Sequence, residues 1–118
     1  MNNPAVASQE RRQHARKAFH SVAYVLLTGR QPIAVRTLDI SPGGMAIVAP
    51  ANPPAKMNCK IRISLPVKLR APTVVEIQAT VLHSVLSRRE NGFKVGLHFV
   101  HPAPEAKQAI AAFLSAPG

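Results

Sequence analysis

The sequence contains few aromatic residues and a single cysteine. Four Phe, one Tyr and no Trp occur among its 118 residues, so a buried core has to be built mainly from Val, Ile, Leu, Ala and Met. Cys59 has no second cysteine with which to form an internal disulfide, and it lies in an apolar stretch. A buried, inert thiol of this kind is typical of a protein from a reducing compartment. We therefore expect a cytoplasmic protein.

Long hydrophobic runs are also missing. The longest, Val22–Leu27, is far shorter than the roughly 20 residues that a membrane-spanning helix needs. The first residues of the chain carry neither the basic stretch nor the apolar stretch of a secretory signal. The sequence therefore predicts a chain without a transmembrane segment, and we expect a monomer.

Acidic residues are scarce, whereas basic residues are abundant. Five Asp and Glu stand against 15 Lys and Arg, which gives a net charge of +10. A charge of this size on a small domain indicates an anionic partner, such as a nucleotide, a nucleic acid, an acidic protein or a lipid surface. The few scattered acids do not suggest a catalytic pair of carboxylates. His98 and His101 have a spacing that would suit metal ligands on a helix but not at the end of a strand, so we predict no enzyme, no metal site and no cofactor.

Alternating apolar and polar residues dominate the middle of the chain. A chain of this length folds as one domain, and the alternation, interrupted by turns rich in Gly, Pro and Asn, predicts strands. Six of them are expected, at about 20–28, 33–40, 45–49, 59–65, 73–87 and 93–99. Six short antiparallel strands favour a closed barrel, because closure removes the unpaired edges of a sheet.

The period changes after Pro102. Ala106, Ile110, Phe113 and Leu114 follow the spacing of one helical face, which predicts a helix at 103–115 across one opening of the barrel. The chain is thus divided into a flexible tail (1–9), a basic arm (10–17), the barrel (20–100) and the helix, with 10–118 forming one domain.

Two short motifs stand out against this background. The arm contains RxxxR, formed by Arg12 and Arg16, and the second strand ends in DxSxxG, formed by Asp39, Ser41 and Gly44. In this order, and next to a small barrel, the motifs resemble those of the PilZ family, whose members bind the second messenger cyclic di-GMP. The resemblance covers about 11–114, and the string from Gly92 to Phe99 is also similar to the last strand of that family.

The resemblance implies both a fold and a binding site. The implied fold is all-β, a six-stranded antiparallel PilZ-like β-barrel with one C-terminal helix. In the family, the two arginines of RxxxR grip phosphate and guanine, and the acid, serine and last glycine of the second motif line the base pocket. An arginine just before RxxxR favours two intercalated ligands over one. The implied ligand residues are Arg11, Arg12, Arg16, Asp39, Ser41 and Gly44.

The chemistry of these residue types suits the same ligand. The planar guanidinium of Arg12 or Arg16 matches a phosphate or the O6 and N7 acceptors of guanine. The carboxylate of Asp39 can accept hydrogen bonds from the opposite guanine edge, and a missing side chain at Gly44 would let a flat base come close. Simpler explanations stay open: Ser41 could cap its own turn, and the arginines could be a solvated charged arm.

These patterns predict a non-enzymatic receptor for cyclic di-GMP. Binding would draw the arm, Glu10–Lys17, onto the Asp39–Gly44 corner, and the altered surface would signal to an unidentified downstream protein. By resemblance, the setting would be bacterial motility, surface attachment or biofilm formation. Two alternatives remain: a basic nucleic-acid-binding β-barrel, which the scarcity of aromatic stacking residues disfavours, and a nucleotide-independent PilZ adaptor in pilus assembly.

Overall fold

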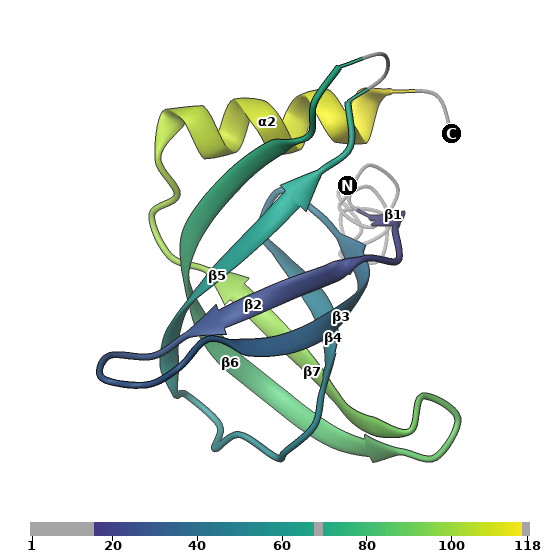
Figure 1. Cartoon of the computed structure of the whole chain (residues 1–118), viewed down its shortest axis with the longest axis vertical. Helices are drawn as coiled ribbons and strands as arrows, with labels where there is room; N and C mark the ends of the chain where they lie inside the picture. The colour runs from purple at the N-terminus through teal and green to yellow at the C-terminus, as the bar shows by residue number, and fades with distance from the viewer. Residues whose placement is uncertain (1–15, 68–69, 117–118) are drawn as a thin grey trace, which may run out of the picture.

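The structure is a computed structural model that describes residues 16–67 and 70–116. Arg11 and Arg12, two of the predicted ligand residues, lie outside this range, as do the predicted tail and most of the arm. In chain order the elements are β1 (Lys17–Ala18), β2 (Val22–Leu26), β3 (Ile33–Ile40), β4 (Gly44–Ala49), β5 (Asn58–Leu65), β6 (Thr73–Ser87), β7 (Gly92–Phe99) and α2 (Pro104–Ser115) (Figure 1).

Six of the strands form a closed barrel. Hydrogen-bonded neighbours run β3–β2–β5–β6–β7–β4, and β4 pairs back with β3, so that the sheet closes on itself. All of these pairings are antiparallel. The predicted fold class, a six-stranded antiparallel barrel with one C-terminal helix, is therefore confirmed. The short strand β1 adds to β3 outside this ring, and the sequence pattern did not predict it, because two residues are too few to show a period.

The alternation predicted from the sequence builds the core. In β5, Cys59, Ile61, Ile63 and Leu65 are buried, whereas Arg62 between them is exposed. The other strands contribute inward side chains in the same way, mostly Val, Ile, Leu, Ala and Met. Aliphatic side chains thus fill a barrel that has few aromatic residues available.

The helix α2 lies across one end of the barrel (Figure 1), as predicted. Pro104 occupies its first turn, where the missing N–H costs no hydrogen bond. Ala106, Ile110 and Phe113 are buried, and Leu114 is half-buried. The apolar face that the sequence predicted is therefore the face that covers the core.

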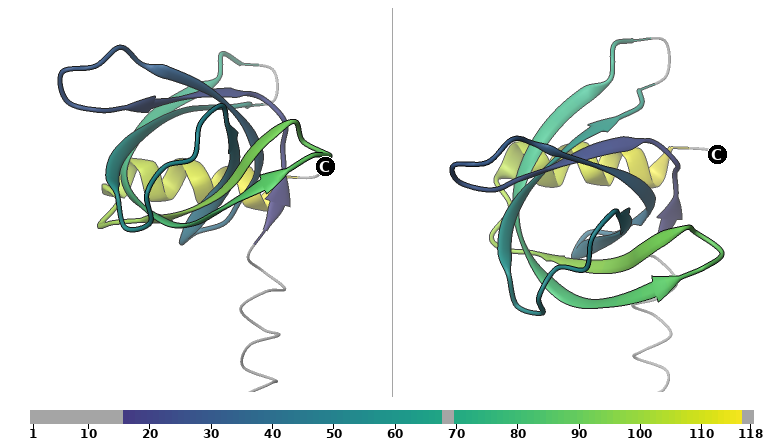
Figure 2. Two further views of the ribbon diagram at one scale, coloured as in Figure 1. Left: turned by 90° about the horizontal axis from the view of Figure 1, so that it is seen from below. Right: turned by 60° about the horizontal axis from the view of Figure 1, so that its bottom comes forward.

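The hairpin of β6 and β7 extends beyond the barrel (Figure 2). β6 has 15 residues. Its first part, 73–80, pairs with β5, whereas 79–87 pairs with β7. The far half of β6 consequently has a neighbour on one side alone, within the part of the chain that the structure describes.

Candidate nucleotide-binding site

Asp39 reaches the outer surface because β3 contains a β-bulge. Thr37 and Ile40 are both buried, and the register with β4 shifts between Thr37 and Asp39. The extra residue breaks the strict alternation that would direct Asp39 to the same face as Thr37. The Asp39 carboxylate therefore lies outside the barrel, with 28% of its side chain exposed.

The turn after β3 is held by Ser41 and by close packing against β7. The Ser41 hydroxyl donates to the Gly44 carbonyl (3.1 Å) and accepts from the Gly44 N–H (3.2 Å), and the Ser41 N–H donates to the same carbonyl (2.8 Å). A Cβ at Gly44 would lie 2.1 Å from the Leu97 carbonyl oxygen. Ser41 thus does cap its own turn, and Gly44 has a packing reason to be glycine that is independent of any ligand.

Arg16 contacts Asp39 because β1 lies beside the end of β3. Lys17 pairs with Ile40 and Ala18 with Asp39, which places the preceding residue next to the bulge. A guanidinium nitrogen of Arg16 donates to a carboxylate oxygen of Asp39. The Arg16 side chain is 57% exposed, so this is a surface ion pair, of a kind that contributes about 0.2–1 kcal/mol.

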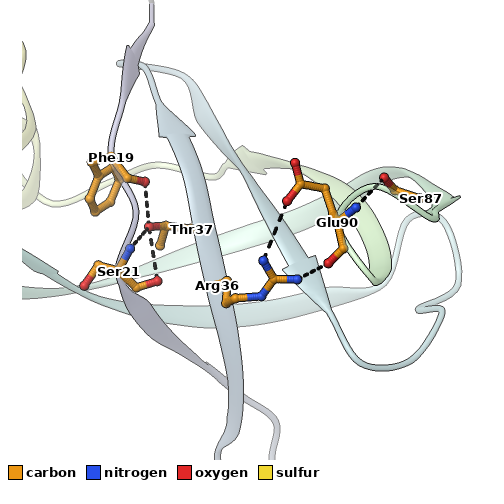
Figure 3. Close-up of polar contacts among 6 residues, drawn as sticks. All are labelled: Phe19, Ser21, Arg36, Thr37, Ser87 and Glu90. Atoms are coloured by element: carbon orange, nitrogen blue, oxygen red, sulfur yellow. Dashed lines mark hydrogen bonds and ion pairs between the residues drawn. The ribbon is translucent and has the colours of Figure 1, made fainter.

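Thr37 fixes the segment that joins β1 to β2 (Figure 3). Its buried hydroxyl donates to the Phe19 carbonyl (2.9 Å) and accepts from the Ser21 N–H (2.9 Å). Two more hydrogen bonds follow from the backbone, because the N–H of Phe19 donates to the Leu38 carbonyl (3.1 Å) and that of Thr37 to the Ser21 carbonyl (2.9 Å). Together with the pairing of β1, these bonds attach the chain to β3 from Lys17 to Ser21.

Lys17 connects this segment to α2. Its Nζ donates to the carbonyls of Phe113 and Ala116, each at 2.9 Å, and lies 4.3 Å from the centre of the Phe113 ring. A cation at the C-terminal end of a helix stabilises its unpaired carbonyls. Phe19 packs edge-on against the same ring, with the ring centres 5.1 Å apart. Any movement of β1 is thus coupled to the end of α2.

A row of cross-strand neighbours extends from Asp39 across the barrel. Asp39 pairs with Ala46 on β4, Ala46 with Gly96 on β7, and Gly96 with His83 on β6. The His83 ring lies over Gly96, since a Cβ there would lie 2.6 Å from its Nε2. These four residues, Asp39, Ala46, Gly96 and His83, are called the binding row below. The row has a carboxylate at one end, and at the other end the imidazole ring of His83 covers Gly96.

The sequence did not reveal the binding row as such. His83 belongs to no motif in the sequence, and its side chain is exposed in the structure. It shares the outer face with Gly96 because the register of β6 and β7 shifts between Val81 and His83. A glycine inside a strand, here Gly96, is the signal that could have indicated a close approach.

Most acidic residues in the described ranges are already paired with arginine. Besides Asp39, Glu90 in the β6–β7 turn contacts Arg36 on β3 (Figure 3). Glu76 on β6 contacts Arg62 on β5 at 2.7 Å. Positive charge therefore dominates the rest of the surface, and an anionic ligand suits it.

An apolar cavity of about 210 Å³ lies away from these residues. It is lined by side chains from several strands and by the loop that contains Pro50 and Pro53, and Arg30 is its charged lining residue. Cys59 also borders it, and burial raises the pKa of this thiol, which keeps it neutral and unreactive. The cavity does not suit a ligand with two phosphates, and it includes none of the predicted ligand residues.

The described residues form neither a cluster of potential metal ligands nor a membrane-spanning helix. Between positions 16 and 116, leaving aside 68–69, no three potential metal ligands come together. In the same part of the chain no helix has the length and apolar character needed to cross a membrane.

Four of the six predicted ligand residues come together at one corner. Arg16 and Asp39 are in contact, and Ser41 and Gly44 form the turn that follows. Ser41 itself is buried, so the accessible polar groups at this corner are those of Arg16 and Asp39. The ligand-binding role of all six residues stays a prediction.

Comparison with solved structures identifies similar folds. The inhibitor of motility MotI/DgrA from Bacillus subtilis superposes with a TM-score of 0.74 at 19% identity, over 85% of this chain and 47% of that one. The PilZ domain of YcgR from Escherichia coli, with c-di-GMP, gives 0.62 at 14% identity, over 84% of this chain and 85% of that one. YcgR in complex with c-di-GMP gives 0.64 at 17% identity, over 84% and 42%. The chain therefore spans about half the length of MotI and less of YcgR.

Sequence comparison adds the family. No curated protein matches this chain. The family model for the PilZ domain, however, matches residues 10–116, which include both motifs, the barrel and α2. With the motifs, the closed barrel and this match in agreement, the chain belongs to the PilZ domain family.

Proposed function

We propose that this chain is a non-enzymatic receptor for cyclic di-GMP. Its membership in a family of binding and adaptor domains supports this, and so does its similarity to a PilZ domain with c-di-GMP bound. The observation that carries the proposal is the contact between Arg16 and Asp39. The contact joins the last residue of RxxxR to the first residue of DxSxxG, which are 23 residues apart in the sequence, at one place on the barrel surface.

Binding would exchange partners at this contact. A phosphate replaces the carboxylate as the partner of Arg16, and the N1–H and N2–H₂ edge of a guanine replaces the guanidinium as the partner of Asp39. The exposed ion pair that is lost contributes about 0.2–1 kcal/mol. Each charge-assisted hydrogen bond that is gained contributes about 1.5–3 kcal/mol. The exchange is therefore favourable, and the empty site keeps both charges compensated.

The binding row provides the surface for the base. A guanine whose edge meets Asp39 would lie over Ala46, the cross-strand neighbour of Asp39 on β4. The ring of His83 then lies at the far end of the base, within reach of aromatic contact.

The arm supplies the remaining cations in this proposal. Arg12 adds a second guanidinium for phosphate, and Arg11 favours two stacked ligands, because a third guanidinium offsets four clustered phosphates. When the ligand binds, the arm closes over it, and the changed charge and shape are read by a downstream protein. We place this process in the bacterial cytoplasm and in the control of motility or surface attachment, a setting consistent with the similarity to an inhibitor of motility.

Calorimetry of the purified chain with cyclic di-GMP tests the receptor proposal. We expect saturable binding with two ligands per chain, and much weaker binding of GMP and cyclic di-AMP. If the chain binds none of the three nucleotides, the receptor proposal is refuted. Saturation at one ligand would refute only the proposed role of Arg11 and would leave the receptor proposal intact. If two ligands bind, Arg11→Leu should reduce the number bound per chain from two to one.

Substitution of Asp39 tests the reading of the guanine. Asp39→Ala should reduce the preference for cyclic di-GMP over cyclic di-AMP more than it changes the dependence of binding on salt. Glu76→Ala is the matched control, because it removes another carboxylate that pairs with an arginine, on β6. If both variants keep the preference, Asp39 is a turn residue. A steep loss of affinity with salt, equal for all nucleotides and for DNA, would instead favour a basic nucleic-acid-binding barrel.

A further inference from the structure

The far half of β6 leaves one of its edges without a partner strand. His83 to Ser87 pair with β7 on one side, and Leu82 lies at the register shift that precedes them. On the other side the β5 register ends at Thr80, and the backbone hydrogen bonds of Lys56 and Met57 reach Val81. Among the described residues, no backbone hydrogen bond continues along this side. The segment 82–87, called the open edge below, therefore presents N–H and C=O groups to solvent.

The side chains of the open edge are apolar and exposed. Leu82, Val85 and Leu86 are 57%, 60% and 63% exposed, and the segment contains no proline and no Lys, Arg, Asp or Glu. Proline and charged residues normally protect free strand edges from pairing with another chain. The open edge lacks them, and it therefore has the properties of a site that accepts a strand.

The charges around the open edge determine which strand it accepts. Arg88 and Arg89 follow it directly and are exposed, and Lys94 lies opposite Val85 on β7. Glu90 is the acid in this hairpin, and it is engaged by Arg36. A second copy of this chain would bring the same basic residues and a further net charge of +10. An acidic segment is favoured instead.

We propose that the open edge binds an extended, acidic segment of a partner protein by β-strand addition. Backbone hydrogen bonds extend the sheet beyond β6. Apolar side chains of the segment pack on Leu82 and Val85 on one face and on Leu86 on the other, and its acidic residues lie beside Arg88 and Arg89. This proposal does not depend on nucleotide binding.

A synthetic peptide tests the open edge directly. The probe is a capped peptide of about eight residues, with alternating Val and Thr and with Glu at both ends, and NMR of the full chain reports on each backbone amide. We expect shift changes and slower hydrogen exchange at 82–87, and about tenfold weaker binding when Lys replaces Glu in the peptide. A peptide with a central proline, which cannot complete the ladder, should not bind.

Val85 and Val74 provide a matched pair of variants. Both are 60% exposed and lie on β6, but Val74 lies where β5 pairs with β6, opposite Ser64. Val85→Asp should abolish peptide binding, because it places a carboxylate where the acidic peptide would lie, whereas Val74→Asp should leave it unchanged. Equal effects, absence of binding, or amides at 82–87 that are as protected in the free chain as those of 75–80 would overturn the proposal. A dimer in light scattering that Val85→Lys dissociates would assign the edge to a second copy of the chain, and so would also overturn it.

Discussion

The two halves of the candidate site are held in different ways. Asp39 to Gly44 belongs to the barrel: a bulge turns Asp39 outwards, Ser41 makes three hydrogen bonds within the turn, and Gly44 packs against β7. Arg16 precedes a strand of two residues, and its side chain is largely exposed. One half is therefore preorganised, whereas the other can exchange partners.

A second ion pair shows what this difference means. Arg62 and Glu76 are direct cross-strand neighbours in the β5–β6 ladder, and both belong to long strands. Arg16 and Asp39 make the same type of contact, but Arg16 precedes a strand of only two residues, β1. Both pairs join an arginine to a carboxylate. They differ in the length of the strand beside the arginine, which is two residues for Arg16 and eight for Arg62. We therefore expect a ligand to exchange with the Arg16–Asp39 pair, whose backbone support is weak on one side, and not with the Arg62–Glu76 pair.

The largest expected effect separates these two ion pairs. Arg16→Ala should weaken cyclic di-GMP binding by about one to two decades, because it removes a charge-assisted contact of roughly 1.5–3 kcal/mol. Arg62→Ala should change binding less than about twofold, although it removes a comparable exposed pair. Calorimetry of both variants, with thermal unfolding as a check of folding, measures the contrast. Equal affinities for the two variants would show that the Asp39 corner is not the binding site.

A substitution in the preorganised half should lower stability. Gly44→Ala places a Cβ 2.1 Å from the Leu97 carbonyl oxygen, so β4 and β7 have to separate, and we expect a loss of about 1–3 kcal/mol in the free energy of unfolding. Gly43→Ala is the control, because a Cβ there meets no atom within 4 Å, and its effect should stay within about 0.5 kcal/mol. Urea denaturation measures both. If the two variants are equally stable, the packing of Gly44 on β7 does not constrain the corner.

The parts of the fold that the sequence predicted are those with a repeated signal. Six strands and one helix follow from alternation and from helical spacing over many residues, and turns with Pro and Gly separate them. RxxxR and DxSxxG name the candidate ligand residues directly, and their ligand-binding role stays a prediction. Arg16 and Asp39 were expected at one site, and the structure brings them into contact.

The parts that it could not predict depend on single residues or on distant contacts. The bulges in β3 and β6 each add one residue, and each reverses the face on which the next side chains lie, which is how Asp39 and His83 reach the outside. The strand β1 is two residues long, and Lys17 contacts the Phe113 carbonyl across 96 residues of sequence. No local pattern encodes such contacts.

A smaller effect should follow when β1 is released from α2. Lys17→Met keeps the apolar stem but removes the donors to Phe113 and Ala116, which should cost about 1 kcal/mol in the free energy of unfolding. Hydrogen exchange at residues 17–19 should also become faster. Lys107→Met, on the exposed side of α2, is the matched control and should change neither quantity. If Lys17→Met leaves exchange unchanged, β3 alone holds β1. The contact with α2 then does not restrain the segment that carries Arg16.

The smallest expected effect concerns the far end of the binding row. His83→Ala should weaken cyclic di-GMP binding about fivefold, because it removes an aromatic contact of roughly 1 kcal/mol with the base. It should leave stability almost unchanged, since the side chain is exposed. His101→Gly is a suitable control: His101 is exposed and has a φ of 45°, which glycine adopts without strain. A fivefold loss of affinity for the His83 variant, with no loss for the His101 variant, would show that the preorganised half of the site reaches from Asp39 across β4 and β7 to β6. Equal affinities would confine the ligand to the Asp39 end of the row, where a single guanine edge and the arginines of the arm would account for the binding.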